Sequence, residues 1–172
     1  MTWNETRKWC LTEYTDIVMV HNENVTYFLK NNLKEKSSSP YYWIGLRKIK
    51  ETFTWAANGQ SVNYENWAPN EPNNNKANEN CVELYTSTNN KGKWNDDSCK
   101  NKKHPVCHKG VQCLPIIDAP GSWSMNCTHP FSINSFNSSC EFKCEEGFEL
   151  KGSNTTWCNH TGQWTHKPPT CT

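Results

Sequence analysis

Three short polar segments carry the side chains of this chain that are best suited to bind a metal ion. They are Glu71-Pro72-Asn73, Glu79-Asn80-Cys81 and Trp94-Asn95-Asp96. Ca²⁺ takes about six to eight oxygen ligands, and both carboxylates and amide carbonyls supply them. An Asn that binds an ion through its carbonyl keeps its NH₂ group free to donate, so a carbohydrate hydroxyl can bind the ion and the Asn together. The segments therefore predict a calcium site that also binds sugar.

Two simpler interpretations compete with this one. Asn, Pro and Glu are ordinary loop residues, so a lone Glu-Pro-Asn is most simply a solvated loop. The second amide and acid cluster, Asn95-Asp96, and the cysteines beside both clusters favour the metal site. Paired carboxylates could instead hydrolyse a glycoside, and the acids available for this are Glu71, Glu79, Glu83, Asp96 and Asp97. A metal would keep these acids ionised, and no Gly-x-Ser-x-Gly, His-Glu-x-x-His or phosphate-loop motif occurs, so we do not expect an enzyme.

The composition indicates an extracellular protein. The chain has 172 residues, a net charge of +1, 34% hydrophobic residues and ten cysteines. This charge gives no general attraction to nucleic acid, whereas an even number of cysteines fits disulfides formed in an oxidising compartment. Six N-glycosylation sequons agree with this, at Asn4, Asn24, Asn126, Asn137, Asn154 and Asn159. No apolar run is long enough to span a membrane and no secretion leader follows Met1. We therefore expect an extracellular or cell-surface ectodomain fragment, or a gene model that starts too late.

The hydrophobic pattern predicts an α+β fold for the first part of the chain. One helix is expected to begin near Asn4 as its N-cap. A second is expected to follow the N-cap Asn22, to end at residues 37–40 and to bury a stripe of Val25, Phe28, Leu29 and Leu33. Short strands are expected at 16–20, 41–46, 53–55, 81–85, 93–95 and 105–107. Residues 59–80 form a long polar loop, which calcium would order where apolar burial cannot.

Four motifs in this first part belong together. They are Trp43-Ile44-Gly45, Trp67-x-x-x-Glu71-Pro72-Asn73, Cys81-Val82-Glu83, and Trp94-Asn95-Asp96 followed by Cys99 and Cys107. Together they resemble a C-type lectin domain, which would span residues 1–109 with two helices, small antiparallel sheets and a long calcium-binding loop. Within that family, residues 41–48, 66–74 and 81–85 are similar to the selectins.

The later cysteines mark a second part of the chain. Cys144-x-x-Gly147-Phe148-x-Leu150, Gly162-x-Trp164 and Pro168-Pro169-x-Cys171 resemble a sushi module, a small all-β disulfide-rich domain that would span residues 110–172. Spacing alone leaves the cysteine pairing open. The resemblance implies Cys10–Cys107, Cys81–Cys99, Cys113–Cys158, Cys127–Cys140 and Cys144–Cys171. Selectins carry an EGF-like module between these two domains, for which residues 109–113 leave no room. They also have a first strand ahead of the position of Met1, which this sequence does not include.

The resemblance also implies roles for individual residues. The Ca²⁺ ligands would be Glu71, Asn73, Glu79, Asn95 and Asp96, with Asn74 alternating with Glu79 and with the Glu71–Pro72 bond in cis. The carbohydrate contacts would be Tyr41, Glu71, Asn73, Glu79, Glu83, Tyr85 and Asn95. Sulfate groups would meet Lys76, Lys103 and His104, whereas composition alone makes Lys100, Lys102 and Lys103 a solvated basic turn. Two positions depart from the selectin pattern: Thr88 replaces an arginine that contacts sialic acid in a relative, and Asp97 replaces the usual Glu.

The function implied by the resemblance is calcium-dependent cell adhesion. The lectin domain would bind sialylated and fucosylated glycans of the sialyl Lewis x kind, and sulfated glycans too, on mucin-like cell-surface glycoproteins. The part of binding that depends on sulfate should fall with added salt, because salt screens the attraction between Lys and sulfate. The alternative is a protein-binding module that acts through the sushi domain while the lectin site is weakened or inactive.

Overall fold

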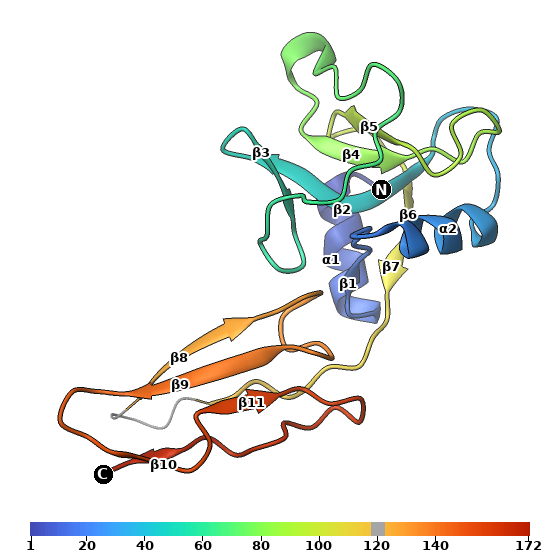
Figure 1. Ribbon diagram of the computed structural model, residues 1–172. Helices are drawn as coiled ribbons and strands as arrows, with labels where there is room; N and C mark the ends of the chain where they lie inside the picture. The colour runs from blue at the N-terminus through green and yellow to red at the C-terminus, as the bar shows by residue number, and fades with distance from the viewer. Residues whose placement is uncertain (118–122) are drawn as a thin grey trace. The chain divides into compact units, whose positions relative to one another are not determined.

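The first unit of the chain, Met1–Lys109, builds a five-stranded sheet with two helices beside it (Figure 1). The computed structural model describes residues 1–117 and 123–172. The sheet has the order β3-β2-β4-β5, and β6 pairs in parallel with β2. Its strands are β2 Tyr42–Ile49, β3 Thr52–Trp55, β4 Cys81–Leu84, β5 Trp94–Asp97 and β6 His104–Pro105, while β1 Asp16–Ile17 pairs with β7 Cys107–His108 in a small separate sheet.

Helix α1, Trp3–Glu13, begins two residues earlier than the sequence predicts. Thr2, not Asn4, is its N-cap, because Thr2 and Glu5 form a capping box in which each side chain accepts from the other's backbone N–H. Asn4 lies in the first turn, and its Oδ1 accepts from Arg47. The helix buries Trp3, Thr6 and Cys10, whose spacing places them on one face.

Helix α2, Glu23–Asn32, follows the predicted N-cap Asn22, whose Oδ1 accepts from the backbone N–H of Val25 at 3.0 Å. The predicted apolar stripe is wrong in part: Leu29 is buried, but Phe28 is 62% exposed and Thr26 takes the buried position. The helix also ends at Asn32, before the serines at residues 37–39. The strand predicted at 16–20 is shorter, at Asp16–Ile17, although Val18–Val20 are buried.

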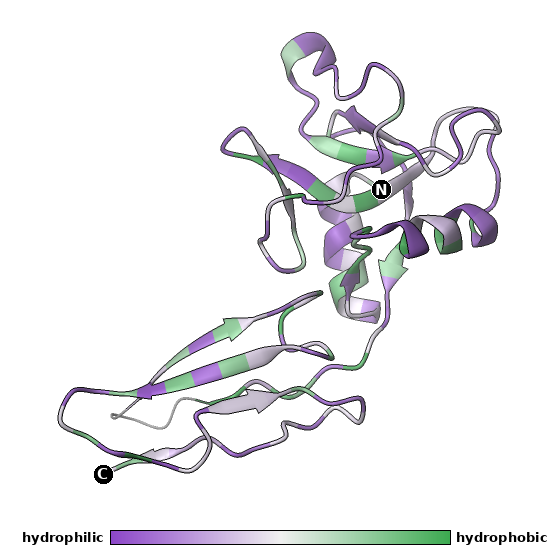
Figure 2. Cartoon of the chain, in the orientation of Figure 1, coloured by the Kyte–Doolittle hydropathy of each residue, from purple (hydrophilic) through white to green (hydrophobic). Residues whose placement is uncertain are grey.

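The core of this unit lies between α1 and β2. Trp3, Cys10, Ile17, Trp43 and Cys81 pack together there, and Figure 2 shows hydrophobic positions along β2 and β4. The Trp3 indole donates to the backbone carbonyl of Ile44 at 2.8 Å. A Cβ atom added to Gly45 would lie 2.8 Å from the carbonyl oxygen of Val18, so the close approach of these two backbones requires glycine at this position.

A second aromatic cluster surrounds Trp94. This side chain is fully buried, and the rings of Trp55, Tyr64 and Trp67 meet it edge-on with centroids 5.8, 6.0 and 5.5 Å away. The backbone of Trp94 also exchanges hydrogen bonds with Asn66 and Ala68, both at 2.9 Å. The cluster therefore fixes the start of the polar loop against β5.

The second unit, Gly110–Thr172, is a small all-β structure. Strands β8 Trp123–Thr128, β9 Ser139–Cys144 and β11 Thr155–Trp157 form one sheet in the order β11-β9-β8, and β10 Leu150–Lys151 pairs with β12 Thr170–Cys171. Along β9, buried Cys140 and Phe142 alternate with exposed Glu141 and Lys143, a pattern visible in Figure 2. This alternation indicates a sheet with one face on the core.

Five disulfides cross-link the chain, each within one of the two units. Cys10–Cys107 and Cys81–Cys99 lie in the first unit, and Cys113–Cys158, Cys127–Cys140 and Cys144–Cys171 lie in the second, which are the pairs that the resemblance implies. No cysteine is left free among residues 1–117 and 123–172. Among the same residues, no helix is long and apolar enough to cross a membrane.

Candidate functional site

The polar loop is anchored to the fully buried carboxylate of Asp96 on β5. The backbone N–H of Asn73 donates to Asp96 Oδ1 at 3.0 Å, and that of Asn74 donates to Oδ2 at 2.7 Å. Hydrogen bonds to an ionised acceptor are stronger than neutral ones. One acid on the sheet therefore fixes where the Glu-Pro-Asn segment lies.

Glu71 and Asn73 lie beside that anchor. The Glu71–Pro72 bond is cis. Glu71 Oε1 accepts from Asn73 Nδ2 at 2.9 Å, and its Oε2 accepts from the Asn73 backbone N–H at 3.1 Å. Burial raises the pKa of Glu71 to about 7, and the neighbouring carboxyl group of Asp96 adds to the rise. The two acids lie close together, because both accept from the backbone N–H of Asn73.

Glu79 closes the loop from the other end. Its Oε2 accepts from the backbone N–H of Asn75 at 2.8 Å, and the same N–H donates to Asn73 Oδ1 at 2.9 Å. The backbone N–H of Glu79 donates to Asn74 Oδ1 at 3.3 Å. Burial raises the pKa of Glu79, and Asp96 contributes in the same direction. The structure thus brings together four of the five predicted ligands, Glu71, Asn73, Glu79 and Asp96, with Asn74 among them.

This donor set fits a hard divalent cation. No salt bridge within the described residues joins Glu71, Glu79 or Asp96 to a basic side chain. Mutual repulsion that raises the pKa of a carboxyl group is relieved by a bound cation. Within the same residues, no group of three or more His, Cys, Asp and Glu side chains could hold a metal by itself. A cation held here would also need the amide oxygens of the Asn residues, and Ca²⁺ is an ion that accepts such a mixture.

The fifth predicted ligand, Asn95, is oriented by Glu83. The two residues are cross-strand partners in β4 and β5, and Asn95 Nδ2 donates to Glu83 Oε1 at 2.8 Å. Asp97 shares their face of the strand, while Asp96 faces the loop, because successive side chains alternate. Lys103 Nζ lies between the two acids, 2.8 Å from Glu83 Oε2 and 2.7 Å from Asp97 Oδ2.

This arrangement corrects two predictions. The Lys103 side chain is 2% exposed and bound to two carboxylates, so it is not placed to meet a sulfate, and it is not part of a solvated turn either. Glu83 is 3% exposed, with both carboxylate oxygens bound inside the protein, so it is not placed as an open sugar contact. Lys100 and Lys102 are exposed, as expected for a basic turn.

The two tyrosines predicted to touch sugar are neighbours. The rings of Tyr41 and Tyr85 meet edge-on with centroids 4.9 Å apart, and Tyr85 is the more exposed of the two. Burial raises the pKa of the Tyr85 hydroxyl, and the charge of Glu83 adds to the rise. Thr88, at the position of the relative's arginine, donates its hydroxyl to Glu35 at 2.8 Å.

The remaining sulfate candidates, Lys76 and His104, lie on different elements. Lys76 is exposed in the short 3-10 helix η1, Asn75–Ala77, at the tip of the polar loop, and exposed His104 lies in β6 (Figure 1). The sequence did not indicate Lys36, which neighbours His104. Burial lowers the pKa of His104, and the charge of Lys36 lowers it further. The two residues are 68 positions apart, so no local signal could have linked them.

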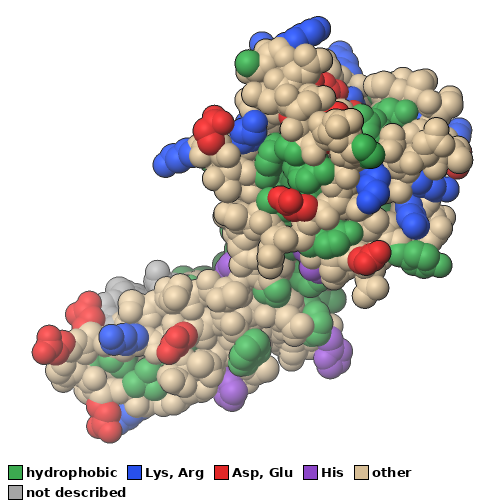
Figure 3. Space-filling view, turned by 45° about the horizontal axis from the view of Figure 1, so that its top comes forward, with side chains coloured by type: hydrophobic (Ala, Val, Ile, Leu, Met, Phe, Trp, Pro, Cys, Tyr) green, Lys and Arg blue, Asp and Glu red, His purple; other side chains and the backbone are tan. Residues whose placement is uncertain are grey.

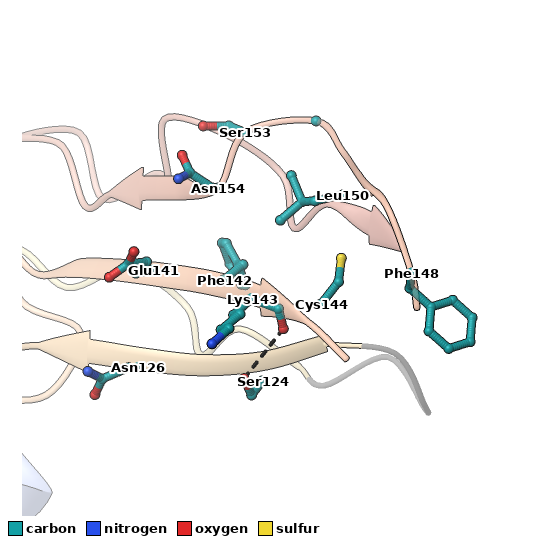
Figure 4. A pocket seen from close by; sticks show the side chains of 11 residues that line it. Ser124, Asn126, Glu141, Phe142, Lys143, Cys144, Phe148, Leu150, Ser153 and Asn154 are labelled. Atoms are coloured by element: carbon teal, nitrogen blue, oxygen red, sulfur yellow. Dashed lines mark hydrogen bonds between the residues drawn. The ribbon is translucent and has the colours of Figure 1, made fainter. Parts of the chain in front are cut away.

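A groove of about 810 Å³ lies on the second unit (Figure 4). Phe142, Phe148 and Leu150 give it an apolar part, and Asn126 and Asn154 are among its polar lining. Both asparagines belong to glycosylation sequons and are exposed. Of the other sequon asparagines, Asn4, Asn24 and Asn137 are exposed and Asn159 is half-buried.

Comparison with protein families gives two matches. The lectin C-type domain matches residues 1–109, and the sushi repeat (SCR repeat) matches residues 113–171. Among solved structures, the carbohydrate-recognition domain of cow CD23, crystallised in the presence of a GlcNAc2Man3 oligosaccharide, is similar. Its TM-score is 0.51 and its identity 33%, over 61% of this chain and 76% of that one. The predicted fold, a C-type lectin domain followed by a disulfide-rich sushi module, is confirmed.

Selectins are similar along nearly the whole chain. Rat (Rattus norvegicus) L-selectin is 35% identical over 209 residues, which cover 99% of this chain and 56% of L-selectin. Mouse (Mus musculus) P-selectin is 35% identical over 99% of this chain and 27% of P-selectin. The chain thus spans about half or less of the length of these relatives.

At 35% identity each, rat L-selectin and mouse P-selectin are equally similar to this chain, so overall identity does not single out one selectin. The L-selectin alignment is 37 positions longer than the 172 residues of this chain, so L-selectin carries residues within the aligned region that have no counterpart here. The match of the lectin model to more than half of the residues shows that this chain belongs to the C-type lectin family, with a sushi repeat after the lectin domain and selectins among its relatives.

Proposed function

We propose that this chain is a Ca²⁺-dependent adhesion lectin that binds sialylated and fucosylated glycans outside the cell. The observation that supports this most is the gathering of Glu71, Asn73 and Glu79 around the buried Asp96, without a basic partner among the described residues. These residues and Asn95 would hold the ion. When bound, the ion supplies an electrophilic centre for a pair of sugar hydroxyls.

The protein's own side chains would complete sugar recognition. Asn73 and Asn95 each carry an amide that can donate to a hydroxyl once its oxygen faces the ion. Tyr85, supported from the side by Tyr41, offers an aromatic face and a hydroxyl next to them. The five disulfides and the exposed sequons support an extracellular or cell-surface location.

A glycan array with and without calcium tests this proposal directly. We expect fucosylated and sialylated probes to bind in millimolar Ca²⁺, to be released by a chelator, and to bind again when Ca²⁺ is restored. The physical reason is that the acids and amides lose their shared partner when the ion leaves. Thermal unfolding in each buffer shows whether the protein stays folded, and undiminished array signal from folded protein in chelator would dismiss the lectin function.

Sulfated ligands should depend on exposed basic residues of the lectin domain. Replacing Lys76 and His104 together by Ala is expected to weaken sulfated sialyl Lewis x several-fold, because an exposed charge pair such as that of Lys76 contributes up to about 1 kcal/mol, whereas the lowered pKa of His104 leaves this side chain to meet a sulfate by a hydrogen bond at neutral pH. Unsulfated sialyl Lewis x should bind nearly as before. Figure 3 shows Lys and Arg spread over the visible face of this unit rather than merged in one patch.

The matched control for that experiment is Lys8→Ala, which removes an exposed charge on α1. It should leave both ligands unaffected. Titration with salt gives a second readout, because the sulfate-dependent part of affinity should fall as ionic strength rises. Equal losses for sulfated and unsulfated probes in the double variant would remove the sulfate assignment.

The second candidate function is protein binding by the sushi module. The observation that favours it is the groove beside Phe148, a side chain that is 50% exposed. Such binding would survive chelation, and Phe148→Ser would weaken it. The same substitution would leave the calcium-dependent array signal unchanged, so the two functions can be separated in one preparation.

A further inference from the structure

The buried Lys103 has a place in the lectin site that its sequence position does not reveal. We propose that Lys103 is a positioning residue, whose charge holds the Glu83 carboxylate in place so that Glu83 can orient the amide of Asn95 toward the ion. This inference rests on the proposed function, since Asn95 is one of the proposed ligands. It assigns Lys103 to the calcium site and not to the recognition of an anionic ligand.

The link from Glu83 to Asn95 fixes which amide atom faces the site. An Asn side chain has a carbonyl oxygen and an NH₂ group on the same carbon, and turning the amide over exchanges them. A carboxylate only accepts, so Glu83 selects the orientation in which Nδ2 points to its Oε1, at 2.8 Å. Oδ1 then lies on the other side of the amide, where a cation can use it.

The link from Lys103 to Glu83 keeps that carboxylate inside the protein. The Glu83 side chain is 4% exposed, and its Oε2 lies 2.8 Å from Lys103 Nζ. Removing one partner of a buried ion pair leaves an uncompensated charge, which is strongly unfavourable. Without Lys103, the Glu83 carboxylate would turn toward water and release Asn95.

Lys103 is itself held from several sides. Asp97 Oδ2 lies 2.7 Å from its Nζ, and the ring of Trp43 lies below it with the centroid 5.1 Å away. Its backbone exchanges two hydrogen bonds with Met1, at 2.9 and 3.0 Å. Asp97 is fixed in turn by the Ser98 backbone N–H and by Asn101 Nδ2. These contacts hold the ammonium group of Lys103 in a fixed position inside the protein.

A double-mutant cycle tests the proposal. Lys103→Met keeps the length of the side chain and removes its charge, and Glu83→Gln keeps an acceptor for Asn95 that needs no counter-charge. With Ca²⁺ alone as the titrant in calorimetry, we expect Lys103→Met to weaken binding at least tenfold. The double variant should recover to within about threefold of the unmodified protein. Lys102→Met, the same change at an exposed neighbour, should have no effect.

A purely structural role would give a different pattern. Lys103→Met would then lower thermal stability while leaving the calcium affinity of the folded fraction unchanged, and Glu83→Gln would not rescue affinity. Either of these results overturns the proposal. If Lys103→Met does not fold, Glu83→Leu decides: it keeps Lys103 paired with Asp97 but removes the acceptor, and calcium affinity equal to that of the unmodified protein would refute the proposed link.

The NMR signals of the Asn95 side-chain NH₂ separate this inference from the function on which it rests. In calcium-free protein, a hydrogen bond to Glu83 gives one Nδ2 proton a downfield shift and slow exchange with water. Lys103→Met should abolish both signatures, and the double variant should restore them. If the unmodified protein binds no calcium, the proposed function fails, whereas unchanged Asn95 signals in Lys103→Met would refute the positioning role alone.

Discussion

Replacing Asp96 by asparagine is expected to abolish calcium binding and, with it, the binding of glycans. Asp96 supplies a charge to the proposed ion and also accepts two backbone N–H groups, from Asn73 and Asn74. An asparagine in its place has one acceptor oxygen and no charge, so the ion loses a ligand and the loop loses its anchor together. Mutating a residue that only supports a metal ligand lowers metal affinity by about 10- to 100-fold. Because Asp96 would itself be a ligand, we expect its replacement to lower calcium affinity by more than about 100-fold, measured by calorimetric titration with Ca²⁺.

Glu65→Gln is the matched control for this variant. It makes the same acid-to-amide change at an exposed residue near the start of the polar loop and should leave calcium affinity unchanged. Circular dichroism of both variants in chelator shows whether each is folded. Persistent calcium-dependent glycan binding by folded Asp96→Asn would contradict the central role given to this acid.

Removing the disulfide Cys10–Cys107 is expected to destabilise the first unit by about 4–5 kcal/mol, because it closes a loop of 97 residues between α1 and β7. The chain-entropy argument gives about 3 kcal/mol for Cys81–Cys99, whose separation is 18 residues. Urea unfolding of two variants, with both cysteines of one bridge replaced by Ala in each, measures the difference.

The comparison of the two bridges also separates stability from function. Cys81–Cys99 encloses β4 and β5, which carry Glu83, Asn95 and Asp96. Removal of Cys81–Cys99 should therefore lower calcium affinity more than removal of Cys10–Cys107 does, although it lowers the free energy of unfolding less. Equal losses of unfolding free energy in the two variants would show that loop length does not govern these bridges.

Local signals in the sequence predict the elements of the lectin domain well where one interaction decides them. Asn22 begins α2 because its side chain satisfies a backbone N–H of the first turn, and that rule needs no tertiary information. At α1 the prediction named Asn4, but Thr2 is the N-cap because Glu5 completes the capping box with it. Phe28 is apolar and correctly spaced, yet exposed, because tertiary packing and not periodicity decides which side of α2 is covered.

In the candidate site, too, some features follow from local sequence and others only from the folded structure. Glu71, Asn73, Glu79 and Asp96 carry their chemistry in short motifs, and the structure brings them together around the loop. Lys103 is part of a run of lysines in the sequence that gives no sign of burial. Its partners, Glu83 on β4 and Asp97 on β5, are brought together by strand pairing, so only the folded structure reveals that this lysine is buried between them.

The aromatic cluster around Trp94 has an optical consequence. Trp94 directly precedes Asn95 and Asp96, and its ring is in edge contact with Trp67, at the start of the polar loop. Indole fluorescence responds to charge and polarity close to the ring, so a divalent ion held by the two following residues would change the emission. The protein would then carry its own reporter for occupancy of this site, and ion titrations could be followed without attaching a dye.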